Sequence, residues 1–224
     1  MRLITASTEI LNKDKINGVE ILKTIEEVGR TCYKSVDKIT DNSYSKFVQS
    51  LVKNEHLAMI EFADITVRFT VDRGITHELV RHRHCNFAQE STRYCNYSQG
   101  KFDNEVNFID IGPGIELCPT TSRMPSVVKA AIVDEWITAC CDAESHYLRM
   151  LELGATPQIA RSVLNNSVKA DLNVNANLRE WRHIFELRCD KAAHPQMREV
   201  MVPLLKEFAE LIPVVFDDLV EKYC

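Results

Sequence analysis

Residues 65–84 read ITVRFTVDRGITHELVRHRH, and the periodicity of this stretch changes partway along it. Over Ile65–Val71 apolar and polar residues alternate strictly, which predicts a strand with one buried face. Asp72–Gly74 then favours a turn, and we expect a helix over Ile75–His84. A strand that passes directly into a helix indicates a fold built from both kinds of element.

The same two periodicities recur along the chain, without a repeat, a low-complexity tract or a linker. A second alternating run predicts a strand at Lys169–Val174. Residues 96–125 are polar and contain several Gly and Pro residues, so we expect irregular structure there, a candidate mobile flap. Helical spacing predicts helices at Val19–Tyr33, Asp41–Lys53, Ser126–Leu153, Pro157–Leu164, Asn177–Arg188 and from Pro195 onward, with a kink at Pro203. The expected fold class is α+β, with a central, mostly antiparallel sheet packed by several helices in one domain over 1–224.

Composition narrows the class of protein further. The 224 residues are 45% hydrophobic and 26% charged, which is ordinary for a globular chain. No apolar run approaches the roughly 18 residues that span a bilayer, and MRLITASTEI at the N-terminus lacks the apolar core of a secretory signal, so we expect a cytoplasmic protein. The net charge of −5 argues against a general nucleic-acid binder, and any anionic ligand must be held by a local basic cluster.

The eight cysteines are expected to be free and buried. None lies in a Cys-x-x-Cys pair or in the spacing of a zinc site. Cys118, in LCPTT, has no neighbouring base that would activate its thiol, so it is not predicted to be a nucleophile.

Residues 77–94, HELVRHRHCNFAQESTRY, carry most of the polar chemistry. On a helix reaching His84, the side chains of His77, Arg81 and His84 would share one face, so the block could grip anions on two sides. A zincin site would need two histidines four residues apart, but Arg81 takes that place after His77, and His82 comes one step too late. A solvated basic helix end is the second alternative.

Residues 81–94 resemble the signature RHRxxSxxxxSxR of flavin-dependent thymidylate synthases. Five positions match in identity and spacing, namely Arg81, His82, Arg83, Ser91 and Arg93. Asn86 stands where the family usually has serine. Upstream, HLAMIEF at 56–62 is similar to the family's H-x-S-P-x-E-H only at His56 and Glu61.

A second region, NLREWRHIFELR at 177–188, has an apolar stripe formed by Trp181, Ile184 and Phe185. At 100° per residue, Arg188 lies about 20° from Trp181 and so emerges on the apolar side of the helix. A guanidinium there needs an anion or several acceptors, and a structural ion pair with Asp190 or another carboxylate is the alternative to a ligand.

This region and Arg161 also resemble conserved parts of the same family. The resemblance implies methylation of dUMP to dTMP, with FAD supplying hydride, 5,10-methylenetetrahydrofolate supplying the carbon and NADPH as reductant. It implies that Arg188 is catalytic and holds the uracil. The residues implied to bind dUMP are Glu78, Arg81, Gln89, Glu90, Ser91, Arg93, Arg161 and Arg188. Those implied to bind FAD are Ala58, Arg81, His82, Arg83, Gln89, Asn177, Arg179 and His183. The family is a homotetramer with shared active sites, and neither a metal, nor nucleic acid, nor a membrane is expected.

Two function classes therefore remain open on the residues. One route to methylation at C5 of uracil is thiolate attack at C6, and the chain lacks a convincing activated cysteine; the family resemblance implies hydride from reduced flavin instead. The alternative class is a non-catalytic nucleotide- or RNA-binding module that uses the basic RHRH block at 81–84. A purified protein that is yellow with bound FAD would favour the enzyme.

Overall fold

The computed structural model describes residues 1–11 and 13–224, and its α+β fold confirms the expected class. A four-stranded sheet has the order β2-β3-β6-β4, and a second sheet consists of β1 and β5 in parallel. The strands are β1 Arg2–Ile4, β2 Ser7–Ile10, β3 Asp64–Asp72, β4 Cys85–Gln89, β5 Asn107–Ile109 and β6 Lys169–Asn177. Along β3 the partners on β6 run backwards, from Thr66 with Asn175 to Thr70 with Asp171, so these strands are antiparallel.

The helices follow the predicted pattern for most of their length. The α-helices are α1 Gly18–Cys32, α2 Ser43–Lys53, α3 Arg73–Leu79, α4 Gly112–Leu117, α5 Ser126–Glu152, α6 Pro157–Ala160, α7 Leu178–Arg188, α8 Pro195–Leu211 and α9 Asp217–Tyr223. Short 3-10 segments are η1 Lys13–Lys15, η2 Val36–Lys38, η3 Leu57–Phe62, η4 Gly100–Phe102, η5 Thr121–Arg123 and η6 Arg161–Val163. None of the helices among the described residues is long and apolar enough to span a membrane.

The described chain divides into two compact units, which are taken separately below. Unit 1 comprises Met1–Thr8, Arg68–Arg81 and Phe87–Asn173, and unit 2 comprises Glu9–Val67, His82–Asn86 and Val174–Cys224. The expectation of one domain over 1–224 stays a prediction.

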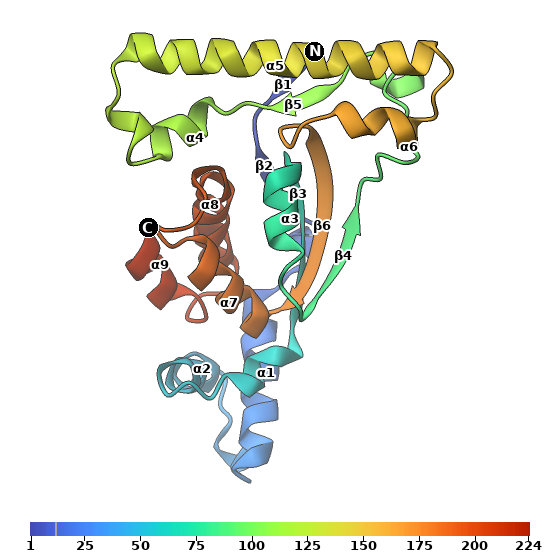
Figure 1. Ribbon diagram of the computed structural model, residues 1–224. Helices are drawn as coiled ribbons and strands as arrows, with labels where there is room; N and C mark the ends of the chain where they lie inside the picture. The colour runs from blue at the N-terminus through green and yellow to red at the C-terminus, as the bar shows by residue number, and fades with distance from the viewer. Residues whose placement is uncertain (12) are drawn as a thin grey trace. The chain divides into compact units, whose positions relative to one another are not determined.

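In unit 1 the long helix α5 lies along β1 and β5 (Figure 1). Its buried residues Cys140 and Tyr147 join Val106 and Phe108 in an apolar core. Gly154, with a φ of 94°, follows the end of α5, a backbone conformation that suits glycine. Ala160 and Val168 belong to the same core, so it fixes the position of Arg161 and of the start of β6.

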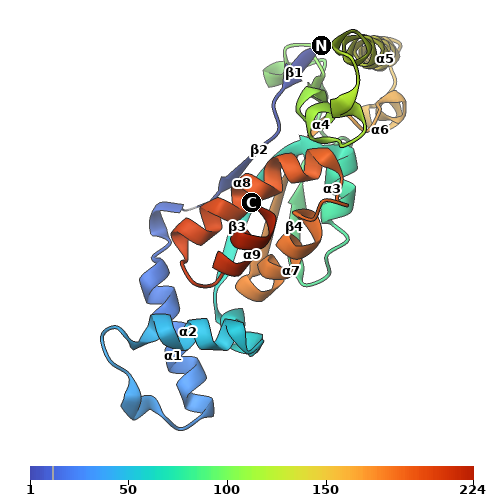
Figure 2. The same cartoon turned by 90° about the vertical axis from the view of Figure 1, so that its left-hand side faces the viewer.

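In unit 2 the helices α7, α8 and α9 lie against one another (Figure 2). Aromatic rings fill the space between them. Phe185 and Phe208 are 5.1 Å apart between ring centroids, and Phe216 lies 5.4 Å from Phe208. Trp181 packs on Phe208, and its indole N–H donates to the carbonyl of Ile65 at 3.0 Å. The predicted apolar stripe of α7 is therefore its buried face, and it ties the helix to β3.

The prediction that the helix after β3 reaches His84 is wrong. Helix α3 ends at Leu79, and the chain forms strand β4 at Cys85–Gln89 beside β6. Asn86 Nδ2 donates to Asn175 Oδ1 at 3.2 Å within unit 2. Pairing with β6 satisfies the backbone hydrogen-bonding groups of this segment, so the strand is more stable here than a longer helix. His77, Arg81 and His84 therefore share no helical face.

Two further expectations need correction. Residues 96–125 contain β5 and α4, and Val106, Phe108 and Ile109 there are buried, because the parallel pairing with β1 orders a run too short to show a period. All eight cysteines are free, but Cys32, Cys141 and Cys224 are exposed rather than buried.

Candidate functional site

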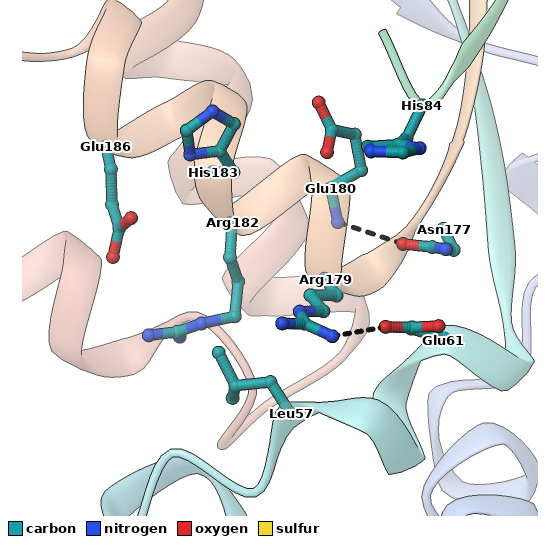
Figure 3. A pocket seen from close by; sticks show the side chains of 9 residues that line it. All are labelled: Leu57, Glu61, His84, Asn177, Arg179, Glu180, Arg182, His183 and Glu186. Atoms are coloured by element: carbon teal, nitrogen blue, oxygen red, sulfur yellow. Dashed lines mark hydrogen bonds and ion pairs between the residues drawn. The ribbon is translucent and has the colours of Figure 1, made fainter. Parts of the chain in front are cut away.

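The first group of candidate residues lies on α7, in unit 2. Asn177 ends β6 and caps α7, because its side-chain oxygen accepts from the backbone N–H of Glu180 at 2.9 Å. Strand and helix therefore join without a loop. Four residues apart on α7, Arg179 and His183 reach the same cavity, which agrees with the predicted shared face (Figure 3).

Two cavities meet at Arg179. One of about 530 Å³ is bordered by η3, the residue before β4, and α7, and a second of about 330 Å³ lies on the η3 side. Leu57 and Arg179 line both cavities. The first is lined by Leu57, Glu61, His84, Asn177, Arg179, Glu180, Arg182, His183 and Glu186. The second is lined by Cys32, Tyr33, Leu51, Glu55, His56, Leu57, Ala58, Met59 and Arg179. The two cavities therefore adjoin at η3 and Arg179.

The larger cavity carries both signs of charge. Arg179 Nη1 donates to Glu61 Oε1 at 2.5 Å, and Figure 3 shows this pair across the cavity. An arginine has five N–H donors, so the remaining donors of Arg179 can still meet an anionic ligand. His84 and His183 add two imidazoles to the lining. The arrangement suits a ligand with an anionic middle and polar groups on both sides.

His82 is buried, 6% exposed, beside this cavity. Its Nδ1 lies 3.5 Å from Glu180 Oε1, and its Nε2 accepts from Arg188 Nε at 3.1 Å. Burial, together with the positive charge of Arg188 and with His183, lowers the pKa of His82 to about 4. His82 is therefore neutral near pH 7, and the partner that the sequence left open for Arg188 includes an imidazole.

His82, Glu180 and His183 also form the kind of cluster that can hold a metal ion. One ligand atom from each lies within 4.8 Å of the others. A guanidinium does not give up its protons, so the Nε2 atom that accepts from Arg188 keeps its lone pair and the proton of neutral His82 sits on Nδ1. A protonated Nδ1 has no lone pair for a cation, and the adjacent guanidinium repels one. The contacts of His82 with Arg188 and Glu180 therefore favour a chain of polar contacts over a metal centre.

Unit 1 holds a second, separate cavity of about 390 Å³ that is lined by two arginines. Arg161 Nη1 donates to Thr92 Oγ1 at 3.0 Å. Arg73 Nη1 is buried and has no hydrogen-bond partner among the described residues. Gln158, Ser162, Asn165 and Asn166 supply polar groups around them. Because a buried guanidinium donor is costly to leave unpaired, this cavity fits an anionic group such as a phosphate.

Next to this cavity, within unit 1, Glu90 directly after β4 forms an ion pair with Lys169 on β6. Lys169 Nζ donates to Glu90 Oε2 at 2.8 Å and to Asp171 Oδ2 at 2.7 Å, and the hydroxyl of Tyr97 donates to Glu90 Oε1 at 3.2 Å. Burial alone would lower the pKa of Lys169, but its bonds to Asp171 and Glu90 outweigh that and raise the pKa. These bonds from Lys169 and Tyr97 fix the position of Glu90, and Ser91, Thr92 and Arg93 follow it directly in the chain.

Comparison with known proteins identifies the family. Residues 18–214 match the model of Thy1, described as thymidylate synthase complementing protein. The chain belongs to the Thy1 family. The flavin-dependent thymidylate synthase of Mycobacteroides abscessus is 30% identical over 207 residues, covering 87% of this chain and 78% of that protein. The enzyme of the same name from Corynebacterium glutamicum is 30% identical over 207 residues, covering 91% and 80%.

The Thy1 fold is also found in solved structures. The UMP/dUMP methylase PolB from Streptomyces cacaoi, bound with 5-Br dUMP, superposes with a TM-score of 0.76. Its sequence is 22% identical, and the match covers 100% of this chain and 98% of that one. The likeness extends over the whole Thy1 chain and shows a common fold.

In this Thy1 family member the fold gathers several of the predicted residues and separates others. Asn177, Arg179 and His183 line one cavity of unit 2, Ala58 lines the adjoining one, and His82 lies beside them, whereas Arg83 is exposed. In unit 1 the predicted nucleotide residues have local partners. Gln89 Nε2 donates to Thr76 Oγ1, Ser91 Oγ accepts from the backbone N–H of Arg93, and Arg93 stacks on Tyr94 at 5.4 Å. Arg81 is exposed after α3, and Glu78 is half-buried on it.

Some residues of the candidate sites were not predicted from the sequence. Glu180 lies three residues after the capping Asn177, an N-terminal helix pattern that was visible in the sequence. His84, Lys169 and Arg73 gave no such signal, because their importance comes from segments distant in the chain. Arg182 is buried, 6% exposed, and pairs with both carboxylate oxygens of Asp218 at 2.7 Å.

Proposed function

We propose that this chain is a flavin-dependent thymidylate synthase that methylates dUMP to dTMP, with FAD, 5,10-methylenetetrahydrofolate and NADPH. The observation that carries the proposal is the pair of cavities that meet at Arg179 in unit 2. They are lined by four of the residues that the family resemblance assigns to FAD, namely Ala58, Asn177, Arg179 and His183.

The residues present fit FAD. A dinucleotide has two long halves joined by a diphosphate, and the linings of the two cavities have Arg179 in common. Arg179, with His84 and His183 beside it, would hold the diphosphate, and Asn177 would hydrogen-bond to the half in the larger cavity. When bound, FAD supplies the hydride for which the chain has no amino-acid equivalent.

The arginine-lined cavity of unit 1 suits the phosphate of the nucleotide. Arg161 is oriented by Thr92, and the Nη1 atom of Arg73 offers a buried donor that gains a partner when an anion binds. In this proposal Ser91 and Arg93 also bind the nucleotide. Glu90, which the family resemblance also assigns to dUMP, is engaged by Lys169 and Tyr97 and acts by holding the segment in place.

Arg188 is proposed to hold the uracil and to stabilise negative charge that develops on its carbonyl oxygen as C5 becomes nucleophilic. A planar guanidinium can direct two N–H donors in a fixed geometry at the lone pairs of one carbonyl oxygen, which an ammonium cannot do. Since His82 is neutral near pH 7, it carries no positive charge that would compete with Arg188 for the negative charge of the substrate.

UMP is a second candidate substrate. PolB, whose fold this chain shares, is named for both UMP and dUMP. The two nucleotides differ only in the 2′-hydroxyl, so a single assay with each of them decides which the chain accepts.

The test is reconstitution followed by turnover. Purified protein with added FAD is expected to retain about one flavin per chain, and with methylenetetrahydrofolate and NADPH to convert dUMP to dTMP. Arg188→Ala is expected to keep its flavin and lose roughly 10²-fold or more of the dUMP-dependent flavin oxidation, as for removal of one charge-stabilising donor. Arg188→Lys should recover part of this loss.

The matched control is Cys118→Ser, which is expected to turn over within about tenfold of the native protein because no thiolate is used. A folded native protein that binds no FAD after exhaustive reconstitution would contradict the enzyme and favour the non-catalytic binding module. Methylation of UMP in preference to dUMP would redirect the proposal to the ribonucleotide.

A further inference from the structure

Within unit 2, a chain of contacts runs from Glu180 through His82 to Arg188. The carboxylate of Glu180 faces Nδ1 of His82 at 3.5 Å, and Nε2 of the same ring accepts from Nε of Arg188 at 3.1 Å. Glu180 and His82 are both buried, so water does not readily replace either contact.

Each link of this chain depends on the position of one proton. Arg188 can only donate, so Nε2 of His82 must carry a lone pair, and the single proton of the neutral ring must sit on Nδ1. The negative charge of the Glu180 carboxylate, 3.5 Å from Nδ1, stabilises a proton on that atom and so favours this tautomer over the other. With the opposite tautomer, or with a protonated ring, an N–H of His82 would point at an N–H of Arg188.

Glu180 is itself held in place on two sides. Its backbone N–H is bound by the capping Asn177, which fixes the first turn of α7. Cys85 Sγ lies 4.0 Å from Glu180 Oε1, and burial together with Glu180 raises the pKa of this thiol to about 12. Cys85 therefore stays a thiol and offers a donor to the carboxylate rather than a competing negative charge.

We propose that Glu180 and His82 are positioning residues for Arg188: Glu180 selects the Nδ1–H tautomer of His82, and His82 then anchors Nε of Arg188 and sets the plane of its guanidinium. The assignment of a catalytic role to Arg188 rests on the proposed function. Anchoring Nε fixes the direction in which the two terminal nitrogens point, and this direction decides whether their N–H groups meet the carbonyl oxygen on which charge develops. Neither Glu180 nor His82 needs to touch the substrate.

The role predicts a separation between turnover and binding. A guanidinium of the right charge but the wrong orientation still attracts the nucleotide, yet it meets the developing charge poorly, and a small misplacement can cost on the order of 10²-fold in rate. We therefore expect kcat to fall and the KM for dUMP to stay within about threefold when the chain of contacts is broken.

The variants differ in whether an acceptor remains. His82→Phe fills the space without an acceptor and is expected to lose about 10²-fold in kcat. His82→Gln places an amide oxygen near the former Nε2 and is expected to recover part of the loss. Glu180→Ala removes the acceptor for Nδ1–H, whereas Glu180→Gln retains an amide oxygen and should be the milder change. Cys85→Ser, which contacts Glu180 from the other side and keeps a donor, is the matched control.

A readout that needs no activity is the tautomer itself. In long-range ¹H–¹⁵N spectra of the protein without nucleotide, His82 is expected to show a bare Nε2 and a protonated Nδ1. Glu180→Ala should shift this pattern toward the other tautomer or a mixture, and Cys85→Ser should leave it unchanged.

These outcomes separate the inference from the proposed function. A protein that binds no FAD but shows the expected tautomer would end the proposed function and keep the Glu180–His82 contact. A protonated Nε2, or a folded, flavin-loaded His82→Phe enzyme with native kcat, would overturn the positioning role. Where His82→Phe does not fold, His82→Gln and the tautomer measurement still decide, and a change confined to KM would likewise contradict positioning.

Discussion

The imidazole of His82 is buried, and charged groups of helix α7, which Asn177 caps, lie around it. Arg188 and Glu180 face its two nitrogens, His183 lies with its ring centroid 5.8 Å away, and Cys85 on β4 approaches Glu180. A proton added to His82 would have to enter a buried site beside a guanidinium. This explains why the pKa of His82 falls from its ordinary 6.5 to about 4.

The lowered pKa makes stability depend on pH in a defined direction. Between pH 6.5 and 4 the unfolded chain protonates His82 while the folded chain does not, so this contribution is complete above pH 6.5 and is lost as the pH falls toward 4. Urea unfolding at pH 7, 5.5 and 4.5 should show a decreasing free energy of unfolding. The His82→Gln variant should lose less over the same range. Because the carboxylates are common to both proteins, equal losses would contradict the lowered pKa.

At the scale of elements, α9 is fastened to α7 through one buried guanidinium. Arg182 donates to both oxygens of Asp218 and to the carbonyl of Val215, while its Nε atom has no partner among the described residues. The bonds from Arg182 outweigh the effect of burial and hold the pKa of Asp218 below its usual range. The pair holds the last helix against the helix that carries the candidate site.

Removing the carboxylate should therefore destabilise unit 2. Asp218→Ala leaves a buried charge with fewer acceptors, and we expect the free energy of unfolding to fall by about 1–3 kcal/mol. Glu221→Ala removes the same charge from an exposed position of α9 and serves as the control. Chemical denaturation of both variants measures the difference, and equal stabilities would mean that the pair contributes nothing.

The elements that the sequence predicted well are those with a long, clear period. Ile65–Val71 and Ser126–Leu153 lie within one residue of β3 and α5 at each end, because the strand alternates strictly and Gly154 closes the helix. Strand β4 was missed because CNFAQ shows no clear apolar alternation, and only its pairing with β6 selects the extended form. The three-residue β5 has too few positions to show any alternation.

The site divides in the same way. Arg179 and His183 reach one cavity because helical spacing is a local property that the sequence states directly. The neutral state of His82 and its contact with Arg188 depend on residues 106 positions apart in the chain, which no local pattern encodes. Lys169 beside Glu90 is a similar case, at a separation of 79 positions.

For the whole molecule, the helix α5 leaves apolar side chains in solvent. Val127 is 73% exposed and Val128 41% exposed, and this is the kind of surface that partner chains cover in assemblies. We expect four chains to associate in solution, as the family resemblance implies. Light scattering after size exclusion should give a mass of four chains at micromolar concentration. Val127→Asp should lower this mass without lowering the melting temperature of the flavin-free protein. A monomer at all concentrations would contradict the expectation.

The joint at Asn177, where β6 passes into α7 with no loop, limits how the length of this chain can vary. One residue inserted there would rotate every later side chain of α7 by 100°, turning Arg179, His183 and Arg188 away from their cavities and partners. An insertion of seven residues would nearly restore the phase, since it falls only about 20° short of two turns. Insertions and deletions are tolerated instead where the backbone turns in open space, as at Gly100 and Gly154, where an added Cβ would meet nothing within 4 Å.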